Sequence, residues 1–193
     1  MKRFAVMASG AGSNFENIVR ACQKKIIQGQ VVGLLTDQPQ ALVLERAVRC
    51  GVATGVLPRA LHGSLAEFDK AQAQLLRAWR PDYVVLAGYL KKIGPAVLAE
   101  FPRRILNIHP SLLPRYGGKG MYGRHVFEAV LAAQEKKSGI TVHWVTDEYD
   151  SGDIVAQEEL IIAENETVES LQRRTQELEH AIYVRVLAQL SEI

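Results

Sequence analysis

The feature that most constrains the fold is an alternation of short apolar runs with amphipathic runs over residues 3–109. The apolar runs suit strands that are buried on both faces of a sheet, and the runs between them have the period of helices. Such alternation, repeated four times, predicts a parallel, doubly wound sheet with helices on both faces. We expect the strand order 3-2-1-4-5. The predicted strands lie at 4–8, 31–35, 52–57, 83–87 and 105–109.

The pattern changes after the fifth predicted strand. It predicts a helix, then two strands joined by an acidic turn, then a long final helix that Thr167 caps. A connection this short predicts an antiparallel hairpin. The sequence therefore predicts one α/β domain over residues 1–193, with a Rossmann-like, doubly wound, mostly parallel sheet that ends in this hairpin and helix. The later elements and the turn lie at 124–134, 140–146, 147–153, 154–162 and 167–190.

Composition excludes several classes of protein. The net charge of +2 gives no basic field of the kind that nucleic-acid binding needs. No apolar run approaches the roughly 20 residues of a membrane span, and the run after the first residues is too short for a signal peptide. Cys22 and Cys50 have no metal-ligand spacing and are expected to be reduced. We therefore expect a cytoplasmic protein that binds neither nucleic acid nor membranes.

Two polar residues stand together where the fifth predicted strand ends. Asn107 and His109 alternate with apolar residues and so share one face, and Pro110 then stops the strand. An amide beside an imidazole suggests a hydrogen-bond donor next to a general acid or base. The alternative is a core histidine that is bonded to a backbone carbonyl. Asp147 and Asp150 in the acidic turn are possible partners, and either carboxylate would raise the pKa of His109 and favour its charged form.

The small-residue turn at 9–14 precedes the first predicted helix, which we expect to run from residue 13 to about Gln28. Backbone N–H groups at a helix N-terminus, with Gly12, Ser13 and Asn14 nearby, favour a phosphate site. The alternative is a capping box, with Ser13 reaching forward and Glu16 reaching back. A dinucleotide site is disfavoured because the third glycine of that motif is missing, although Asp37 could contact a ribose.

No metal site is expected in the acidic turn. Asp147, Asp150 and Asp153 stand three residues apart, but they lack the glycine and the distal glutamate of a calcium loop.

Four segments, in order along nearly the whole chain, resemble the folate-dependent formyltransferases, and together they resemble the phosphoribosylglycinamide formyltransferases of purine biosynthesis. This resemblance implies the formyltransferase fold. It also implies transfer of a formyl group from 10-formyltetrahydrofolate, as cosubstrate, to the amine of glycinamide ribonucleotide. The products would be formylglycinamide ribonucleotide and tetrahydrofolate. The four segments are 9–14 (SGAGSN), 107–114 (NIHPSLLP), 141–152 (TVHWVTDEYDSG) and 179–183 (EHAIY).

The resemblance also assigns roles to residues. It implies a catalytic trio of Asn107, His109 and Asp150, and it alone favours Asp150 over Asp147. Glu179 would hold the nucleotide substrate together with Gln176, whereas residue type alone would make Glu179 a surface charge. Gly12, Ser13 and Asn14 would bind the substrate phosphate. The folate would lie between two walls formed by Leu90, Lys91, Lys92 and Ile93 and by Thr146, Asp147, Glu148, Tyr149 and Asp150.

Three departures from the family pattern affect these assignments. The chain has Tyr89, Leu90 and Lys91 where the family commonly has a Phe-Met-Arg type of run. The spacing from His109 to Asp150 is longer than in the commonest form, and the glycine-rich region 118–123 holds the extra residues. No arginine is found at the expected place for the folate tail, where the chain has Leu65.

Other members of the same class are less suited to this chain. A formyltetrahydrofolate hydrolase normally carries an extra N-terminal domain, and a methionyl-tRNA formyltransferase carries a C-terminal RNA-binding extension. A folate- or nucleotide-binding module without catalysis would have no need of the complete trio. We expect small-molecule substrates only, no metal, and either a monomer or a homodimer.

Overall fold

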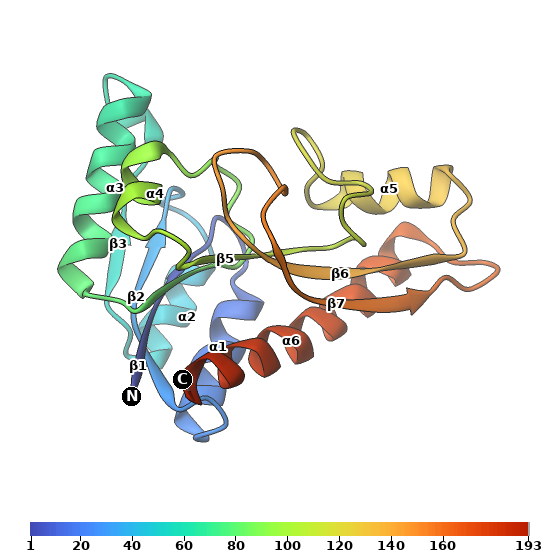
Figure 1. Cartoon of the computed structure of the whole chain (residues 1–193), viewed down its shortest axis with the longest axis horizontal. Coiled ribbons are helices and arrows are strands. Elements are labelled where there is room, and N and C mark those ends of the chain that lie inside the picture. The colour runs from blue at the N-terminus through green and yellow to red at the C-terminus, as the bar shows by residue number, and fades with distance from the viewer. Residues whose placement is uncertain (193) are drawn as a thin grey trace.

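A computed structural model describes residues 1–192 of the chain. One seven-stranded sheet runs through the molecule in the order β3-β2-β1-β4-β5-β6-β7 (Figure 1). The first five strands are parallel and in the predicted order, and β6 and β7 form the predicted antiparallel hairpin. The strands are β1 (Lys2–Met7), β2 (Gly29–Thr36), β3 (Thr54–Val56), β4 (Tyr83–Leu86), β5 (Ile105–His109), β6 (Lys137–Trp144) and β7 (Ile154–Ile161).

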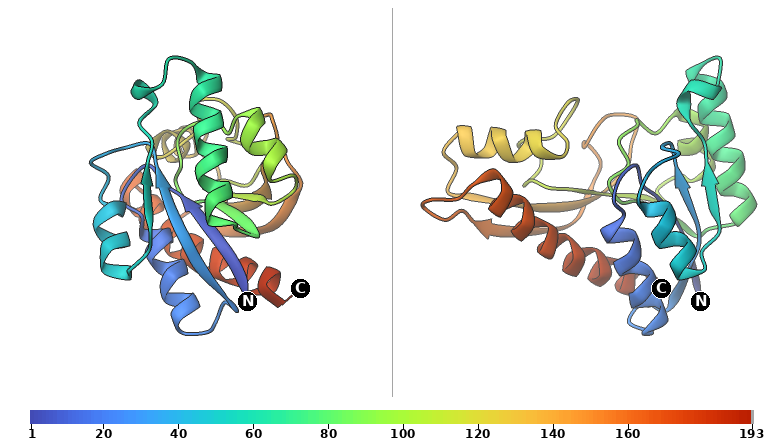
Figure 2. Two further views of the ribbon diagram at one scale, coloured as in Figure 1. Left: turned by 90° about the vertical axis from the view of Figure 1, so that its left-hand side faces the viewer. Right: turned by 180° about the vertical axis from the view of Figure 1, so that it is seen from behind.

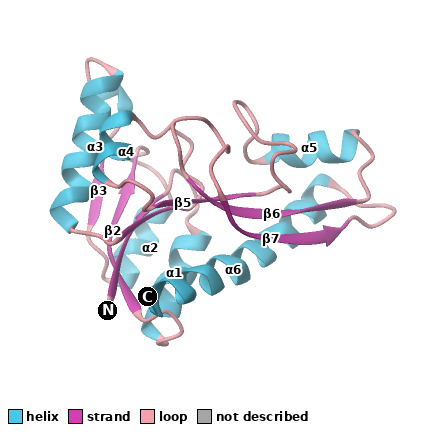
Figure 3. Ribbon diagram, in the orientation of Figure 1, coloured by secondary structure: helices cyan, strands magenta, loops and turns pink. Residues whose placement is uncertain are grey.

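Helices cover both faces of this sheet, as the alternation of the sequence predicts (Figures 2 and 3). Apolar residues of α1, α2 and α6 pack on one face, and those of α3 and α4 pack on the other. A third cluster joins α5 to α6. The helices are α1 (Ser13–Gln23), α2 (Val43–Cys50), α3 (Leu65–Trp79), α4 (Pro95–Glu100), α5 (Arg124–Ala132) and α6 (Val168–Glu192), with a 3₁₀ turn η1 at Arg59–Leu61.

The first helix is shorter than predicted. It ends at Gln23, because Lys25 adopts a positive φ of 58° that an α-helix does not accommodate. Ile26, which the helical period would place on the inner face, is 54% exposed. The final helix begins as predicted, since the Thr167 hydroxyl accepts a hydrogen bond from the backbone N–H of Ser170 at 3.1 Å.

Two features of the sheet position the site. In β5, Leu106 and Ile108 pack in the cluster beneath α1 and α6, so Asn107 and His109 point to the opposite face. The antiparallel pairing of β5 with β6 places Asn107 directly opposite His143. Within residues 1–192, no helix combines the length and the apolarity that crossing a membrane requires.

Candidate active site

A cavity of about 620 Å³ lies beyond the carboxyl ends of β1, β4 and β5. Ligands of doubly wound sheets bind at this position, where the direction of winding changes. The glycine-rich loop 118–123, Phe127 of α5, the hairpin turn and one side of α6 form further walls. Asp147 is exposed and does not line the cavity. The predicted residues that do are Gly12, Ser13, Asn14, Leu90, Lys91, Lys92, Ile93, Asn107, His109, Thr146, Glu148, Tyr149, Asp150, Gln176 and Glu179.

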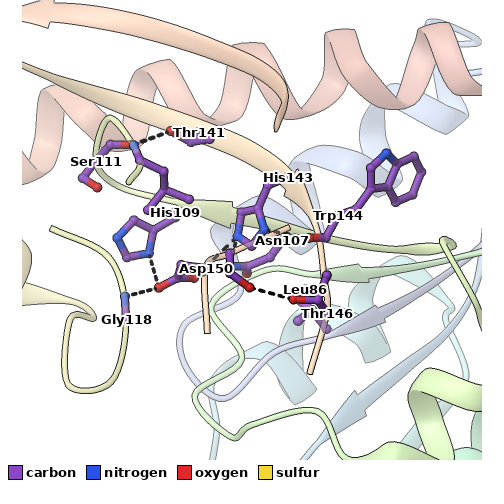
Figure 4. A network of polar contacts seen from close by, with 12 residues as sticks. Leu86, Asn107, His109, Ser111, Gly118, Thr141, His143, Trp144, Thr146 and Asp150 are labelled. Carbon is purple, nitrogen blue, oxygen red and sulfur yellow. Dashed lines mark hydrogen bonds and ion pairs between the residues drawn. The ribbon is translucent and has the colours of Figure 1, made fainter. Parts of the chain in front are cut away.

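Asn107 is held by a histidine that the sequence did not assign to the site. The ring of His143 donates from Nδ1 to the carbonyl of Trp144 at 2.9 Å, because a carbonyl only accepts. Its Nε2 therefore accepts from Asn107 Nδ2 at 3.1 Å. The same amide nitrogen lies 3.4 Å from Asp150 Oδ1 (Figure 4). The amide of Asn107 is thus oriented from two sides.

His109 is buried, with 4% of its surface exposed. Its Nε2–H donates to the carbonyl of Tyr116 at 2.8 Å, and its Nδ1 lies 3.5 Å from Asp150 Oδ2. The sequence left two alternatives for His109, a hydrogen bond to a carbonyl or a position beside a carboxylate. The structure shows both contacts at once. The long connection between His109 and Asp150 therefore does not keep the pair apart.

The expectation that Asp150 keeps His109 charged is wrong. Burial lowers the pKa of His109, and this effect outweighs the charge of Asp150 and the hydrogen bond to Tyr116, which both raise it. His143 lowers the pKa further. His109 is therefore a neutral imidazole near pH 7, with its proton on Nε2 and a lone pair on Nδ1.

Of the two candidate aspartates, Asp150 is the one that faces the imidazole. Burial raises the pKa of its carboxyl, but His143, the charge of His109 and the backbone N–H of Gly118 together hold that pKa below its ordinary value. The Gly118 N–H donates to Oδ2 at 2.9 Å.

The hairpin turn that carries Asp150 closes tightly at Gly152, where a Cβ would lie 1.8 Å from the carbonyl oxygen of Trp144. Only glycine fits there.

The capping box predicted at the start of α1 is absent from the structure. Gly12 is the N-cap, and no side chain caps the helix. Gly12 needs to be glycine, because φ is 76° and a Cβ would lie 2.3 Å from Val43. The hydroxyl of Ser13 accepts from Gln176 Nε2 at 2.8 Å, and the Glu16 carboxylate pairs with two arginines. The first N–H groups of α1 therefore line the cavity without a side-chain acceptor.

Glu179 is not the surface charge that its residue type suggests. Asn14 Nδ2 donates to Glu179 Oε2 at 2.9 Å, and burial of the carboxyl raises its pKa to about 7. Asn14 itself is buried, and within residues 1–192 its Oδ1 has no hydrogen-bond partner. This end of the cavity thus combines a helix N-terminus with a half-buried carboxyl whose pKa lies near 7.

The two loops predicted to hold folate face each other. Lys92 Nζ lies 5.7 Å from the centre of the Tyr149 ring, while Ile93 is buried and Leu90 is half exposed. The loop of Leu90 is held in place because its N–H donates to the hydroxyl of Ser9 at 3.0 Å. That hydroxyl donates in turn to Asp37 at 2.6 Å. Asp37 is buried and does not line the cavity, so it is not placed to contact a ribose there.

Within residues 1–192, no group of three or more His, Cys, Asp or Glu side chains could hold a metal ion. The residues that sequence reasoning missed fall into two kinds. His143 lies in an alternating strand, and the register that brings it opposite Asn107 could have identified it. The Tyr116 carbonyl and the Gly118 N–H are backbone groups, for which the sequence carries no signal.

Comparison with known proteins agrees with this geometry. The formyl transferase family matches residues 2–187. The chain is 38% identical to phosphoribosylglycinamide formyltransferase of Bacillus subtilis, over 98% of this chain and 95% of that protein. It is 41% identical to the chloroplastic phosphoribosylglycinamide formyltransferase of Arabidopsis thaliana, covering 99% of this chain but only 66% of the relative's own length.

The fold matches solved structures equally well. The crystal structure of glycinamide ribonucleotide transformylase 1 from Symbiobacterium toebii superposes with a TM-score of 0.94 at 38% identity, covering 100% of this chain and 88% of the other. The chain therefore belongs to the formyl transferase family, among the phosphoribosylglycinamide formyltransferases.

Proposed function

We propose that this chain transfers the formyl group of 10-formyltetrahydrofolate to the amine of glycinamide ribonucleotide, a step of de novo purine biosynthesis. The observation that carries the proposal is the division of one cavity into two ends. Asn107, His109 and Asp150 meet at one end, and the N-terminus of α1 lies with Glu179 at the other. A phosphate fits the first N–H groups of a helix.

The reaction needs a hydrogen-bond donor that stabilises the negative oxygen of the intermediate. It also needs a group that carries one proton between the two nitrogens. The amine nitrogen attacks the formyl carbon and gives a tetrahedral intermediate with a negatively charged oxygen. Asn107 Nδ2 is the donor to that oxygen, and its longer contact, 3.4 Å to Asp150, is the one that the oxygen would replace. One such donor is typically worth about 10²–10³ in rate.

The proton moves from the attacking amine to the leaving nitrogen of folate. Neutral His109 accepts it on Nδ1, and the ionised Asp150 at 3.5 Å stabilises the imidazolium that forms. His109 then gives the proton to the leaving nitrogen as the carbon–nitrogen bond breaks. This releases tetrahydrofolate and the formylated product. Positioned proton transfer of this kind contributes about 10²–10⁴ in rate.

The remaining residues bind and orient the two substrates. Gly12, Ser13 and Asn14 would hold the phosphate, and Glu179 with Gln176 would hold the rest of the nucleotide. The folate would lie between the loop 90–93 and the turn 146–150, with Asp147 contributing through the backbone of that turn rather than through its carboxylate. Holding both substrates together supplies several kcal/mol more of the catalytic effect. No step requires a metal, and we propose one catalytic domain over residues 1–193.

A hydrolase that uses water in place of the amine is the nearest competing function. Measuring tetrahydrofolate release from 10-formyltetrahydrofolate with and without glycinamide ribonucleotide separates the two. We expect release only when the nucleotide is present, in equal amount to the formylated product. Release without the nucleotide would make the chain a hydrolase, and no release under either condition would make it a binding protein.

A further inference from the structure

The glycine-rich loop between β5 and α5, residues 116–123, supplies two backbone groups to the catalytic end of the cavity. The Tyr116 carbonyl accepts the Nε2–H of His109 at 2.8 Å. The Gly118 N–H donates to Asp150 Oδ2 at 2.9 Å (Figure 4). One short segment therefore holds both members of the His109–Asp150 pair, and any shift of the loop changes both contacts together.

This loop is in a backbone conformation that needs support. Tyr116 has a φ of 55° and Gly118 a φ of 93°. A positive φ is uncommon for a tyrosine and costs on the order of 1 kcal/mol or more. The loop also packs closely on the site, since a Cβ on Gly117 would lie 3.2 Å from the Cβ of Asp150 and 2.5 Å from Leu113. Such a conformation persists only where neighbouring groups hold it.

The support comes from outside the cavity. The hydroxyl of Tyr116 donates to Glu135 Oε1 at 2.7 Å. The guanidinium of Arg115 pairs with the same carboxylate and lies 5.5 Å from the centre of the Tyr116 ring. The hydroxyl of Ser111 donates to the Arg115 carbonyl at 2.6 Å. Neither Tyr116 nor Glu135 lines the cavity, so neither is placed to touch a substrate.

We propose that Tyr116 and Glu135 are positioning residues, which fix the loop so that the proton of neutral His109 stays on Nε2 and its Nδ1 stays free toward Asp150. The catalytic part of this proposal rests on the proposed function, because Nδ1 is the nitrogen that accepts the proton of the amine. If the ring instead carried its proton on Nδ1, it would donate to Asp150. It would then have no lone pair at the place where the amine reacts.

The position of the ring proton can be measured without any substrate. We expect ¹⁵N NMR of the His109 ring, in the neutral form, to show the proton on Nε2 in the unsubstituted protein. Tyr116→Phe removes only the hydroxyl, and Glu135→Ala removes its acceptor, so both should populate the Nδ1–H form. Glu135→Gln keeps an acceptor oxygen and should keep the Nε2–H form. Glu159→Ala, which removes an exposed ion-pair partner of Lys137, is the matched control.

Kinetics then decide whether this control of the proton matters for the reaction. Tyr116→Phe and Glu135→Ala should each lower kcat about 10-fold, part of the 10²–10⁴ that positioned proton transfer gives. The KM for the nucleotide should stay within twofold, because the N-terminus of α1 and Glu179 are untouched. If Tyr116→Phe does not fold, a comparison of Glu135→Ala with Glu135→Gln, in ring protonation and in kcat, tests the same proposal.

Two results would overturn the proposal. One is that His109 keeps its proton on Nε2 in both Tyr116→Phe and Glu135→Ala. The other is that the proton moves to Nδ1 while kcat stays unchanged. If the unsubstituted protein transfers no formyl group, the proposed function fails, whereas the ring measurement still decides whether Tyr116 and Glu135 position His109.

Discussion

Asp150 and Glu179 are two carboxylates of the same cavity, and their surroundings shift their pKa values in opposite directions. Burial disfavours the ionised form of both. Asp150 receives compensation from the Gly118 N–H, from His143 and from the charge of His109, so its pKa falls. Glu179 receives one hydrogen bond, from Asn14, and its pKa rises to about 7. Deeper burial and fewer compensating contacts together raise the pKa of Glu179, whereas the contacts of Asp150 outweigh its burial and keep it charged.

This difference suits the two ends of the cavity to different tasks. An ionised Asp150 carboxylate can stabilise an imidazolium that forms on His109, whose Nδ1 lies 3.5 Å away. A carboxyl that titrates near pH 7 can serve as donor or acceptor toward a bound nucleotide. Pairs of titratable groups with separated pKa values are a common feature of sites that perform proton transfer. The substitutions below test whether the two ends are separate in this sense.

His109→Ala should have the largest effect. It removes the proton carrier, and kcat should fall by about 10²–10⁴. Nucleotide binding should change little, because His109 is not at the end formed by Asn14 and Glu179. Steady-state kinetics and a titration of nucleotide binding measure the two quantities. Comparable losses in both would mean that His109 supports the structure rather than the reaction.

Asp150→Asn should lower kcat by about 10², and it should also move the pH profile. The charge of Asp150 raises the pKa of His109, so its removal lowers that pKa further. Because the reaction uses neutral His109, the acidic limb of the profile should shift to lower pH. A pH–rate profile of the variant measures this, and an acidic limb that stays in place would remove Asp150 from the trio.

Glu179→Gln should change how stability depends on pH. The folded-state pKa of Glu179 is raised to about 7 from an ordinary value of 4.5. Its contribution to stability is therefore fully present below the ordinary pKa and is lost as the pH rises through about 7. From pH 4 to pH 8 the unsubstituted protein should lose about 3 kcal/mol relative to Glu179→Gln. Chemical unfolding of both proteins at the two pH values measures the difference, and parallel curves would contradict the raised pKa.

The same substitution should have a smaller effect on binding. Above pH 7 the ionised carboxylate is a stronger acceptor than an amide, so Glu179→Gln should weaken nucleotide binding about 10-fold at pH 8. At pH 6, where Glu179 is protonated, the two proteins should bind alike. Calorimetric titration at both pH values gives the comparison. Equal weakening at pH 6 and pH 8 would mean that charge plays no part.

The sequence predicts the topology of the sheet better than it predicts the ends of the helices. The strand order and the hairpin follow from patterning, because buried parallel strands and their connections leave few alternatives. The end of α1 at Gln23 was not predictable, since it depends on a positive φ at Lys25 in a segment that keeps a helical period. The capping box is absent because the hydroxyl of Ser13 instead accepts a hydrogen bond from Gln176, which lies far away in the sequence on helix α6.

The site shows the same division. Asn107 and His109 stood out as polar residues at a strand end, the acidic turn offered Asp147 and Asp150 as partners, and the resemblance favoured Asp150. The predicted charge of His109 was wrong. The sequence shows a nearby carboxylate, but it does not show that burial lowers the pKa of His109 by more than the carboxylate raises it. The elevated pKa of Glu179 could not be predicted either. It depends on burial between α1 and α6 with a single donor, and such packing leaves no local mark in the sequence.

The most direct test of the separation between the two ends is a ¹³C NMR titration of the carboxyl groups of Asp150 and Glu179 in the ligand-free protein. Glu179 should titrate with a midpoint near pH 7. Asp150 should remain ionised to a pH below its ordinary pKa of 3.8. Two midpoints that both lie near the ordinary values, or a Glu179 that titrates below Asp150, would contradict the division of the cavity into a charged catalytic end and a titrating nucleotide end.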